Sequence, residues 1–534
     1  MPLNVRPPGG RGNAGQMRSQ ELRDFRGGLN LSDDLFKVGD NESPDMLNLD
    51  VHARGGLVLR GGMRARSDVR PGSWLFDGVY RFKASDGSEA ELLVSVLEDG
   101  APSTVVDMIG GTQSRQLWFT ETDVAGDDGL SASQMNDRLY FFSKRYSPRF
   151  GSWDGTEMDW GTTRPVEPGV SGSEWGDPNV APSATLSAVW DNRMWVGNTK
   201  EAGVDHRNRL RWSADGNPEV WSEDDWIDVD VGEDGDCITA LEVHGEILMV
   251  FKRRSVYALV QDDSTLYRRV DISRSVGAAG PHAVKSTPYG LMFWDSNAGL
   301  HAWNEGQPSP IGDKIIEAIH EDRIVDADDV RLSWANSRLW CTVDFDGERS
   351  DLLFDPRLGA WTRYSPSVEL VHEFDGELRG WSANLGRYLA VELHDRVDDL
   401  GSGGEAIPAH WVSSWIHGGS HIVEKRWRRP RMVLASSSRD DLRVEVRADL
   451  DPRKNVRTFN VTLPGRTSLS SWGSSTWGDA EWGSASVFEF AELVRGPAIG
   501  NFNSIQFRVS GPKGLTRWRL DAVTASYIPK VMRS

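Results

Sequence analysis

The feature that most constrains the fold is a short unit that recurs along the chain. Each copy consists of a turn of Asn, Asp or Gly type followed by an apolar strand. Five copies begin at Asn136, Asp191, His244, Tyr289 and Asn336. Their starts lie about 45 to 55 residues apart, which is the length of a four-stranded propeller blade. The spacing therefore predicts an all-β body of the β-propeller type.

Two further strand pairs extend this pattern at both ends of the repeat region. One lies at residues 79–96 and the other at residues 373–392, so that we expect six to eight blades in total. The chain carries 23 Trp and 55 Gly residues, which favours short strands with aromatic anchors and glycine turns. The tryptophans expected to be buried in or between blades are Trp195, Trp303, Trp340 and Trp361.

A finer pattern, Ser-x-Asp-Gly-x4-Trp, occurs at Ser152 to Trp160 and again at Ser213 to Trp221. An Asp-Gly turn, with the Asp side chain bonded to its own loop and the Trp packed on the hairpin, accounts for the spacing. The pattern resembles the Asp-box of sialidase-type propellers, although the glycine and tryptophan offsets differ. A sialidase-like glycoside hydrolase therefore stays open as an alternative.

Composition divides the chain into three parts. Residues 1–24 are Gly-, Pro- and Arg-rich without periodicity, and we expect an extended N-terminal arm. The run at 398–405 is typical of a linker, so that the propeller body is expected at 25–400. Alternating strands beyond it predict a β-sandwich-like domain at 401–534. Helix is scarce, the best candidate being 313–324 with Asp313 as N-cap.

The charge balance argues against a protein that wraps nucleic acid. The formal net charge is -19 and the pI is about 5.1, so that the phosphate-neutralising contribution to such binding is missing. Arginines in the arm and one basic strand stand out against this acidic background, and we interpret them as contacts to a neighbouring subunit or as a charged strand edge. These interface candidates are Arg6, Arg11, Arg18, Arg23, Lys425, Arg426, Arg428, Arg429 and Arg431.

No pattern in the sequence predicts a catalytic residue, a cofactor or a metal site. There is no Gly-x-Ser-x-Gly elbow, phosphate-binding loop or His-Glu-x-x-His motif. His410, His417 and His421 lack a completing ligand set, and we interpret them as a surface loop. The acidic run 228–236 offers oxygen ligands without EF-hand spacing, which favours a solvated turn. A glycosidase carboxylate pair depends on distance in space, and the sequence leaves it open.

Localisation follows from what the sequence lacks. The N-terminus has no apolar stretch typical of a secretory signal, and no apolar run reaches the roughly 20 residues that span a bilayer. We therefore expect a cytoplasmic protein without membrane insertion. The two cysteines, Cys237 and Cys341, lie in apolar segments and are expected to be buried free thiols.

A series of short motifs, in a fixed order, resembles a known family. They occupy residues 25–30, 41–48, 55–63, 209–213, 236–241, 250–257, 275–281, 355–361 and 425–431. The first three are a Gly-Gly-Leu-Asn motif, a segment ending in Asn48, and a Gly-x-Leu-x-x-Arg-x-Gly motif. Each is weak alone, but their order over most of the chain resembles the tail nozzle or tail tubular proteins of short-tailed bacteriophages and related minor tail proteins.

The resemblance implies a structural, non-enzymatic role in a phage tail. Proteins of this family are propeller-based, and nozzle proteins assemble as six-fold rings around the DNA channel. The expected partners are copies of the same chain, other tail proteins, and viral DNA that passes without specific binding. The expected location is the virion tail, assembled in the host cytoplasm. A host-receptor or glycan-binding tail-tip protein, using exposed Trp side chains, is the alternative.

Overall fold

The computed structural model describes most of the chain in two compact units. Unit 1 comprises residues 1–64, 357–365 and 392–534, and unit 2 comprises residues 65–356 and 366–391. The described residues are 16–31, 38–66, 74–87, 89–97, 103–108, 114–119, 130–144, 148–153, 158–160, 181–201, 203–230, 236–263, 266–325, 329–393, 398–400, 404–437, 439–463, 492–512 and 516–530.

Unit 2 is built from small antiparallel sheets whose strands follow one another in sequence order. Sheet one contains β8 (Trp74–Lys83), β9 (Glu89–Leu97), β10 (Ser103–Met108) and β11 (Ser114–Phe119). Sheet two contains β12 (Ser131–Met135), β13 (Arg138–Phe142), β14 (Arg149–Trp153) and β15 (Met158–Trp160). Sheet three contains β16 (Ser183–Trp190), β17 (Arg193–Glu201), β18 (Val204–Ala214) and β19 (Asn217–Asp228).

The remaining sheets of unit 2 repeat this plan. Sheet four contains β20 (Ile238–His244), β21 (Ile247–Lys252), β22 (Val256–Asp263) and β23 (Leu266–Ser273). Sheet five contains β24 (Val284–Thr287), β25 (Gly290–Asp295), β26 (Gly299–Trp303) and β27 (Ser309–Pro310). Sheet six contains β29 (Arg331–Ala335), β30 (Arg338–Phe345) and β31 (Glu348–Asp355), and the short strand β28 (Ile324–Val325) also pairs with β30. Sheet seven contains β33 (Glu369–Phe374), β34 (Glu377–Ser382) and β35 (Arg387–Leu393).

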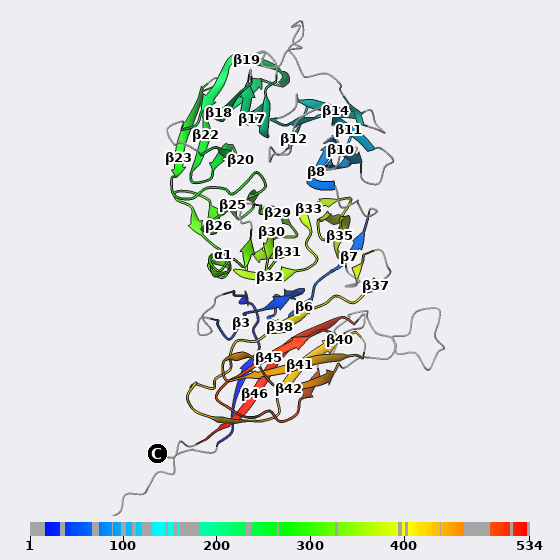
Figure 1. Ribbon diagram of the computed structural model, residues 1–534, viewed down its shortest axis with the longest axis vertical. Coiled ribbons are helices and arrows are strands. Elements are labelled where there is room, and N and C mark those ends of the chain that lie inside the picture. The colour runs from blue at the N-terminus through cyan, green and yellow to red at the C-terminus, as the bar shows by residue number, and fades with distance from the viewer. Residues whose placement is uncertain are drawn as a thin grey trace, which may run out of the picture. The chain divides into compact units, whose positions relative to one another are not determined.

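The sheets of unit 2 form a closed ring. The first strands of successive sheets contact one another in the order β12, β16, β20, β24, β29 and β33, while β34 of the last sheet contacts β8 of the first. A shared cluster around Phe82 and Phe141 joins sheets one and two. Figure 1 shows the sheets following one another around this ring. Seven sheets in the described residues of unit 2 confirm the propeller-like body and lie within the predicted six to eight blades.

The turns that mark the repeat take the backbone conformation expected of tight hairpins. A two-residue hairpin of this kind needs positive φ at both central positions, which Asn and Asp tolerate best. The pairs are Asn136 and Asp137 (φ 51° and 55°), Asp191 and Asn192 (50° and 55°), and Asn336 and Ser337 (50° and 58°). The repeated unit is therefore the turn into the second strand of each sheet.

The four tryptophans predicted to be buried are all buried. Trp195 and Trp340 are 0% exposed, Trp361 is 1% exposed and Trp303 is 7% exposed. Trp195 packs against Trp190 and Trp212, with ring centroids 5.3 and 4.8 Å away. These indoles serve as core anchors, as their place in the repeated strands predicted.

For the Asp-Gly-Trp pattern at Ser213 to Trp221, the prediction of a packed Trp is correct, and the prediction that the Asp side chain bonds its own loop is wrong. Trp221 is buried in a cluster that joins sheets two and three. The Asp215 carboxylate accepts a hydrogen bond from Asn192 at 2.8 Å, in the neighbouring turn of the same sheet, instead of bonding its own loop. The copy at Ser152 to Trp160 includes residues outside the described part of the chain.

Unit 1 contains two antiparallel sheets. Its strands are β1 (Arg18–Leu22), β2 (Gly28–Leu29), β3 (Glu42–Ser43), β4 (Met46–Leu47), β5 (Leu49–Val51), β6 (Leu57–Leu59), β7 (Gly62–Ala65), β32 (Ala360–Tyr364), β36 (Asp398–Asp399), β37 (Gly404–Glu405), β38 (His410–Val412), β39 (Lys425–Trp427), β40 (Arg431–Ser436), β41 (Asp441–Ala448), β42 (Asp451–Thr462), β43 (Glu492–Arg495), β44 (Gly500–Phe502), β45 (Ile505–Ser510) and β46 (Trp518–Pro529). One sheet has the order β43-β40-β46-β39-β44, with β1 and β6 also paired to β46 and β5 paired to β6, and the other has the order β4-β38-β45-β41-β42. The short strands β2, β3, β7, β32, β36 and β37 belong to neither of these two sheets.

The core of unit 1 follows from alternation along these strands. In β41, every second side chain from Leu442 to Ala448 is fully buried, and the residues between them are exposed or half-buried. In β46, Trp518, Leu520 and Val523 are buried. Two sheets that each bury one face form a β-sandwich-like domain, as predicted for the C-terminal part.

The predicted domain boundaries are wrong at both ends of the propeller. Residues 25–64 and 392–400 belong to unit 1, together with the insertion 357–365. Strand β6 pairs with β46, and Gly28 of β2 pairs in parallel with Trp361 of β32. Such pairings join segments hundreds of residues apart, and composition gives no sign of them.

The expected arm and linker are also partly wrong. Strand β1, inside the predicted arm, pairs with β46, and its Leu22 is only 2% exposed; residues 1–15 lie outside the described part of the chain. Within the predicted linker, Asp398 is buried and begins a strand that pairs with β37. The helix is shorter than predicted: α1 (Ile316–His320) has Ile315, not Asp313, at its N-cap.

Candidate functional site

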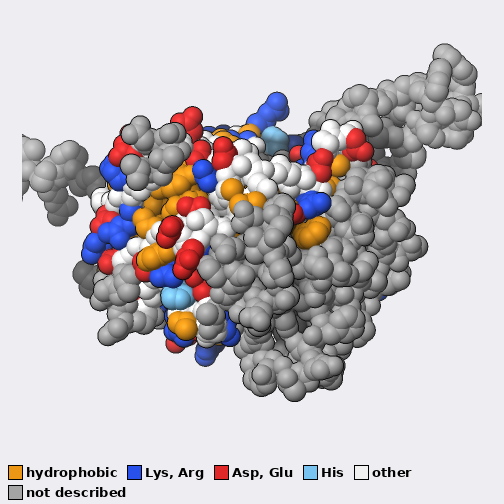
Figure 2. Space-filling model, turned by 90° about the horizontal axis from the view of Figure 1, so that it is seen from above, with side chains coloured by type: hydrophobic (Ala, Val, Ile, Leu, Met, Phe, Trp, Pro, Cys, Tyr) orange, Lys and Arg blue, Asp and Glu red, His pale blue; other side chains and the backbone are white. Residues whose placement is uncertain are grey.

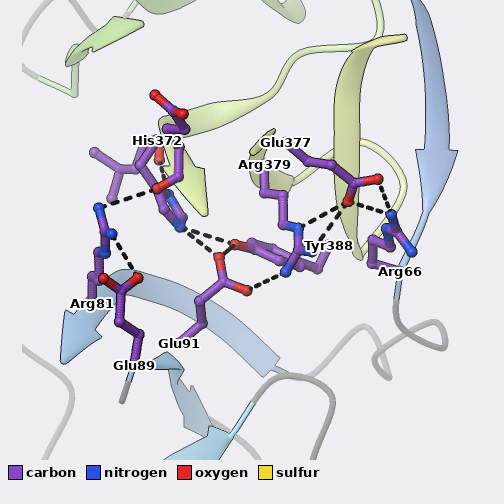
Figure 3. Close-up of polar contacts among 10 residues, drawn as sticks. Arg66, Arg81, Glu89, Glu91, His372, Glu377, Arg379 and Tyr388 are labelled. Atoms are coloured by element: carbon purple, nitrogen blue, oxygen red, sulfur yellow. Dashed lines mark hydrogen bonds and ion pairs between the residues drawn. The ribbon is translucent and has the colours of Figure 1, made fainter. Parts of the chain in front are cut away.

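A buried polar cluster of unit 2 lies where the ring closes, and we call it the closure cluster. Its central residues are Glu91 of sheet one and His372, Arg379 and Tyr388 of sheet seven (Figure 3). The Glu91 carboxylate accepts hydrogen bonds from His372 Nε2 at 2.8 Å, Tyr388 Oη at 2.6 Å and Arg379 Nη1 at 2.8 Å. Its side chain is completely buried. One carboxylate therefore joins all three strands of the last sheet to the first.

Local structure explains how His372 reaches this carboxylate. Strand β33 is irregular between Glu369 and His372, and Leu370 has a φ of +50°. Positive φ is unfavourable for a residue with a bulky side chain, so that the surrounding packing has to hold it. The Leu370 carbonyl oxygen lies 3.0 Å from His372 Nδ1, which fixes the ring with Nε2 toward Glu91.

The electrostatics of the closure cluster favour a charged Glu91. Burial on its own acts to raise the pKa of Glu91, but the hydrogen bonds from His372, Tyr388 and Arg379 outweigh it, and the pKa is lowered. Burial and the adjacent Glu91 carboxylate raise the pKa of Tyr388, which therefore stays a neutral hydroxyl donor. A buried carboxylate with these donors links the strands that carry them, and the strength of this link depends on every donor being present.

An ion pair extends the closure cluster to the first residues of unit 2. Arg379 contacts Glu377, with Nη2 3.1 Å from Oε2, and Arg66 also contacts Glu377. The Arg66 backbone N–H donates to the Tyr388 carbonyl oxygen at 2.8 Å. The chain thus enters unit 2 beside the strand by which it leaves, and Figure 3 shows Arg66 and Glu377 at the end of this chain of contacts.

A second buried network lies inside unit 1, and we call it the arginine hub. Arg60 is 0% exposed, and its Nη1 and Nη2 lie 2.8 and 2.6 Å from the two carboxylate oxygens of Asp398. Arg60 Nε donates to Asn48 Oδ1 at 2.9 Å, and its Nη1 also donates to the Gly61 carbonyl oxygen at 2.8 Å. Asp398 further accepts from the Met63 N–H at 3.0 Å. The hub fixes the N-terminal and C-terminal segments of unit 1 to one another.

The motifs that carry the family resemblance meet in unit 1. Asn48 and Arg60 of the arginine hub come from the second and third motifs. Gly28 of the first motif has a φ of +68°, and a Cβ at this position would lie 2.5 Å from the Trp361 carbonyl oxygen. Asn30 donates to Glu42 of the second motif at 2.7 Å. Only glycine permits the close approach of Gly28 to the Trp361 backbone.

Two motifs meet in unit 2 in the same way. The Ala278 N–H donates to the Lys252 carbonyl oxygen at 2.9 Å. A Cβ on the preceding residue, Gly277, would lie 2.0 Å from that oxygen, while the Gly277 N–H donates to Asp295 at 3.0 Å. The motif residues therefore contact one another as packing and turn residues, and their spacing reflects the fold.

The predicted interface residues lie in different environments. Arg6 and Arg11 are outside the described residues. Arg18 and Arg23 are exposed, and Arg23 pairs with Glu21 at 2.7 Å. Their exposure is compatible with a contact to another subunit, which stays a prediction.

In the basic strand, the prediction is wrong for Lys425. Its side chain is buried, and its ammonium donates to three backbone carbonyl oxygens, those of Ser420, Val423 and Asn503. The burial lowers the pKa of Lys425. Strand alternation places Lys425 and Trp427 inward, whereas the other four cations of the run, Arg426, Arg428, Arg429 and Arg431, are exposed.

The groups considered for metal binding have other partners. Among the described residues, no three or more His, Cys, Asp or Glu side chains are placed to hold a metal ion. His410 contacts Asp45 at 2.9 Å, and His417 packs against His421 with ring centroids 4.1 Å apart. In the acidic run, Asp228 accepts from Arg209 at 2.9 Å, and residues 231–235 lie outside the described part of the chain.

The cysteine prediction is correct for one residue and wrong for the other. Cys341 is fully buried, and burial raises the pKa of its thiol. Cys237 is only half-buried, because it lies at the entry to β20 rather than within a strand.

The described residues expose little aromatic area. Among the tryptophans whose side chains are described, the one exposed is Trp226, at 41%, and the Arg209 guanidinium covers its ring at 3.9 Å. Figure 2 shows acidic and basic side chains interspersed on the described part of one face. Among the described residues, no helix is long and apolar enough to cross a membrane.

Comparisons with known proteins add little. No family model and no curated protein matches the sequence. A solved structure titled "YCF48 bound to D1 peptide" is similar over 65% of this chain and 97% of its own, with 10% sequence identity and a TM-score of 0.32. A TM-score this low supports no inference, and the propeller-like assignment depends on the sheets of unit 2 themselves.

Proposed function

We propose that the chain is a structural, non-enzymatic component of a bacteriophage tail, either a ring or nozzle segment or a tail-tip segment. The observation that carries this proposal is that the segments with the family-like motifs contact one another. The motifs within residues 25–63 contact one another and Trp361, and the motif at 250–257 contacts the motif at 275–281. Residues that form turns, close backbone approaches and a buried ion pair define a scaffold. The resemblance thus depends on architectural residues, as a shared structural role requires.

The two polar networks support the same role. In both the closure cluster and the arginine hub, the buried charged groups bond to segments of the same unit that lie hundreds of residues apart. A glycosidase or hydrolase would need buried carboxylates that face substrate. Glu91 and Asp398 instead direct their oxygens to protein donors, which favours a mechanical function.

In this proposal the chain assembles with copies of itself, six-fold in a nozzle, and contacts other tail proteins. Viral DNA passes through the channel without specific binding, and the net charge of -19 suits such a conduit because it repels phosphate. The protein would be assembled in the host cytoplasm, without membrane insertion, and located in the virion tail.

Electron cryo-microscopy of virions from the phage that encodes this chain tests the proposal. We expect unit 2 to fit density in the tail, in six copies for a nozzle ring, or in three copies or one for a tip. Absence of the chain from purified particles would refute the tail role. Hydrolysis of host glycans by the purified protein, abolished by one Asp or Glu substitution, would support the glycoside hydrolase alternative instead.

A further inference from the structure

Four arginines share the outer face of one sheet of unit 1, and we call them the arginine stripe: Arg426, Arg428, Arg431 and Arg495. The first three lie beside alternate residues of β46, which are Ile528, Ser526 and Thr524. Alternate residues of a strand point to the same side of the sheet, so that the arginines beside them share that side. An uninterrupted strand would place Arg428 and Arg431 on opposite faces, but the break between β39 and β40 brings them onto one.

The arginine stripe costs the folded chain stability. Arg431 and Arg495 are direct cross-strand partners, and like charges opposite one another destabilise a sheet. All four arginines of the stripe are exposed, and within the part of the chain that the structure describes none has a side-chain hydrogen bond or ion pair. Leu493, which is 52% exposed, lies on the same face two residues from Arg495. An unpaired basic stripe beside an exposed leucine is the composition of a surface that meets an acidic protein partner.

The chain itself carries the complementary charge in its other unit. By sequence, unit 1 holds 31 Lys and Arg against 24 Asp and Glu, whereas unit 2 holds 29 Lys and Arg against 55 Asp and Glu. Unit 1 of one copy is therefore electrostatically complementary to unit 2 of a second copy. Leu493 favours this partner over a nucleic acid, because a phosphate backbone makes no use of an exposed apolar side chain.

Unit 2 presents unpaired carboxylates on β19, the last strand in the order of sheet three (Figure 1). Residues 211–213 of β18 pair at their ends with residues 221–226 of β19, so that β19 has three residues more than its partner and bulges there. The bulge carries Glu223 and Asp224, both exposed and, among the described residues, without a side-chain hydrogen bond or ion pair. Trp226, which is 41% exposed, ends the same segment. We call these three residues the acidic bulge.

We propose that the arginine stripe of one copy binds the acidic bulge of a second copy, with guanidinium–carboxylate pairs beside an apolar contact between Leu493 and Trp226. The two surfaces differ, so that the interface is heterologous, and its repetition forms a ring where the rotation closes. This inference deepens the proposed assembly of the chain with copies of itself and rests on it. The position of the assembly in a tail does not enter the argument.

Reciprocal charge reversal in the full-length protein tests this interface, with self-association measured by sedimentation velocity at about 50 mM salt, where screening is weak. We expect Arg431→Glu and Asp224→Arg each to weaken association by at least about tenfold, as for the loss of a close charge pair. An equimolar mixture of the two variants should recover association, because each variant keeps the surface that the other has lost. Arg453→Glu is the matched control: it makes the same charge change at an exposed arginine of β42, on the other sheet of unit 1, and should associate like wild type.

The melting temperature separates loss of the interface from loss of the fold. In Arg431→Glu the introduced carboxylate lies opposite Arg495, so that this variant should melt no lower than wild type. The proposal is overturned if the wild-type protein stays monomeric up to about 0.1 mM, if Arg453→Glu weakens association as much as Arg431→Glu, or if the mixture stays dissociated. Binding of duplex DNA that is lost in Arg431→Glu and kept in Asp224→Arg would overturn it in favour of a nucleic-acid site. None of these results bears on the tail location, which the content of purified particles decides.

Discussion

The arginine hub makes a quantitative prediction about unit 1. Substitution Asp398→Asn keeps the size and shape of the side chain but removes the charge that neutralises Arg60. The Arg60 side chain is 0% exposed and that of Asp398 is 3% exposed, so that solvent cannot replace the missing carboxylate. Removing one partner of a buried ion pair costs about 3 to 5 kcal/mol. We expect a loss in the upper half of this range, because Asn48 and Gly61 still hold the guanidinium in place.

The assay is urea-dependent hydrogen exchange of the amides in β41 and β45, which assigns the free energy of unfolding to unit 1. The matched control is Lys530→Ala, which breaks the exposed pair of Lys530 and Glu424 (2.9 Å, side chains 44% and 46% exposed). An exposed pair contributes about 0 to 1 kcal/mol, so that the control should stay close to wild type.

A double variant separates the ion pair from general packing. Arg60→Leu with Asp398→Leu removes both charges, and we expect it to be more stable than Asp398→Asn, because no buried charge is left without a partner. The reasoning is refuted if Asp398→Asn costs no more than Lys530→Ala, or if the double variant loses the full sum of the two single substitutions.

Three further predictions concern the core, a buried acid and the N-terminus. Trp195→Ala should cost about 3 to 5 kcal/mol of unfolding free energy in urea denaturation, whereas Trp226→Ala, which removes an indole that is 41% exposed, should cost less than about 1 kcal/mol; equal losses would show that Trp195 is not a core anchor. Burial raises the pKa of Asp351 to about 8, above its unfolded value, so that the free energy of unfolding should fall as the pH rises from about 4 to 8. Asp351→Asn should flatten this fall when the free energy of unfolding is measured across that range. An unchanged dependence on pH in the variant would contradict the raised pKa of Asp351. Deletion of residues 1–15 should leave the melting temperature unchanged but lower incorporation into particles on quantitative blots, and incorporation at the wild-type level would reject an assembly role for the arm.

The repeat of unit 2 could be predicted from local sequence because its signals are local. Two-residue turns with positive φ need Asn, Asp or Gly, and apolar strands follow them at once. Trp195 and Trp340 could be assigned to the core for the same reason, since their strands repeat. Seven sheets in the described residues therefore agree with a prediction made from spacing alone.

The boundaries and the polar networks could not be predicted in this way. Asp398 lies in a Gly- and Ser-rich run and has the composition of a linker, but its partner Arg60 lies 338 residues earlier. Glu91 is the third residue of β9, just ahead of its apolar run, where a carboxylate is usually taken as exposed, and its donors lie 281 to 297 residues later. Strand β1 has no apolar periodicity of its own and depends on β46 for its hydrogen bonds. A single sequence carries no information on such distant pairings.

The two kinds of signal have different roles in specifying the fold. Apolar strands that repeat from sheet to sheet allow the sheets to pack on one another but do not determine which sheets become neighbours. They therefore do not by themselves decide which two sheets close the ring. A buried carboxylate does decide this, because a ring closed on the wrong sheet would leave Glu91 without His372, Arg379 and Tyr388, at a cost of several kcal/mol. We infer that the closure cluster selects sheet seven as the neighbour of sheet one. If this is right, Glu91→Gln should increase the fraction of protein that refolds into species with unprotected β9 amides, even under conditions where the correctly closed ring is stable.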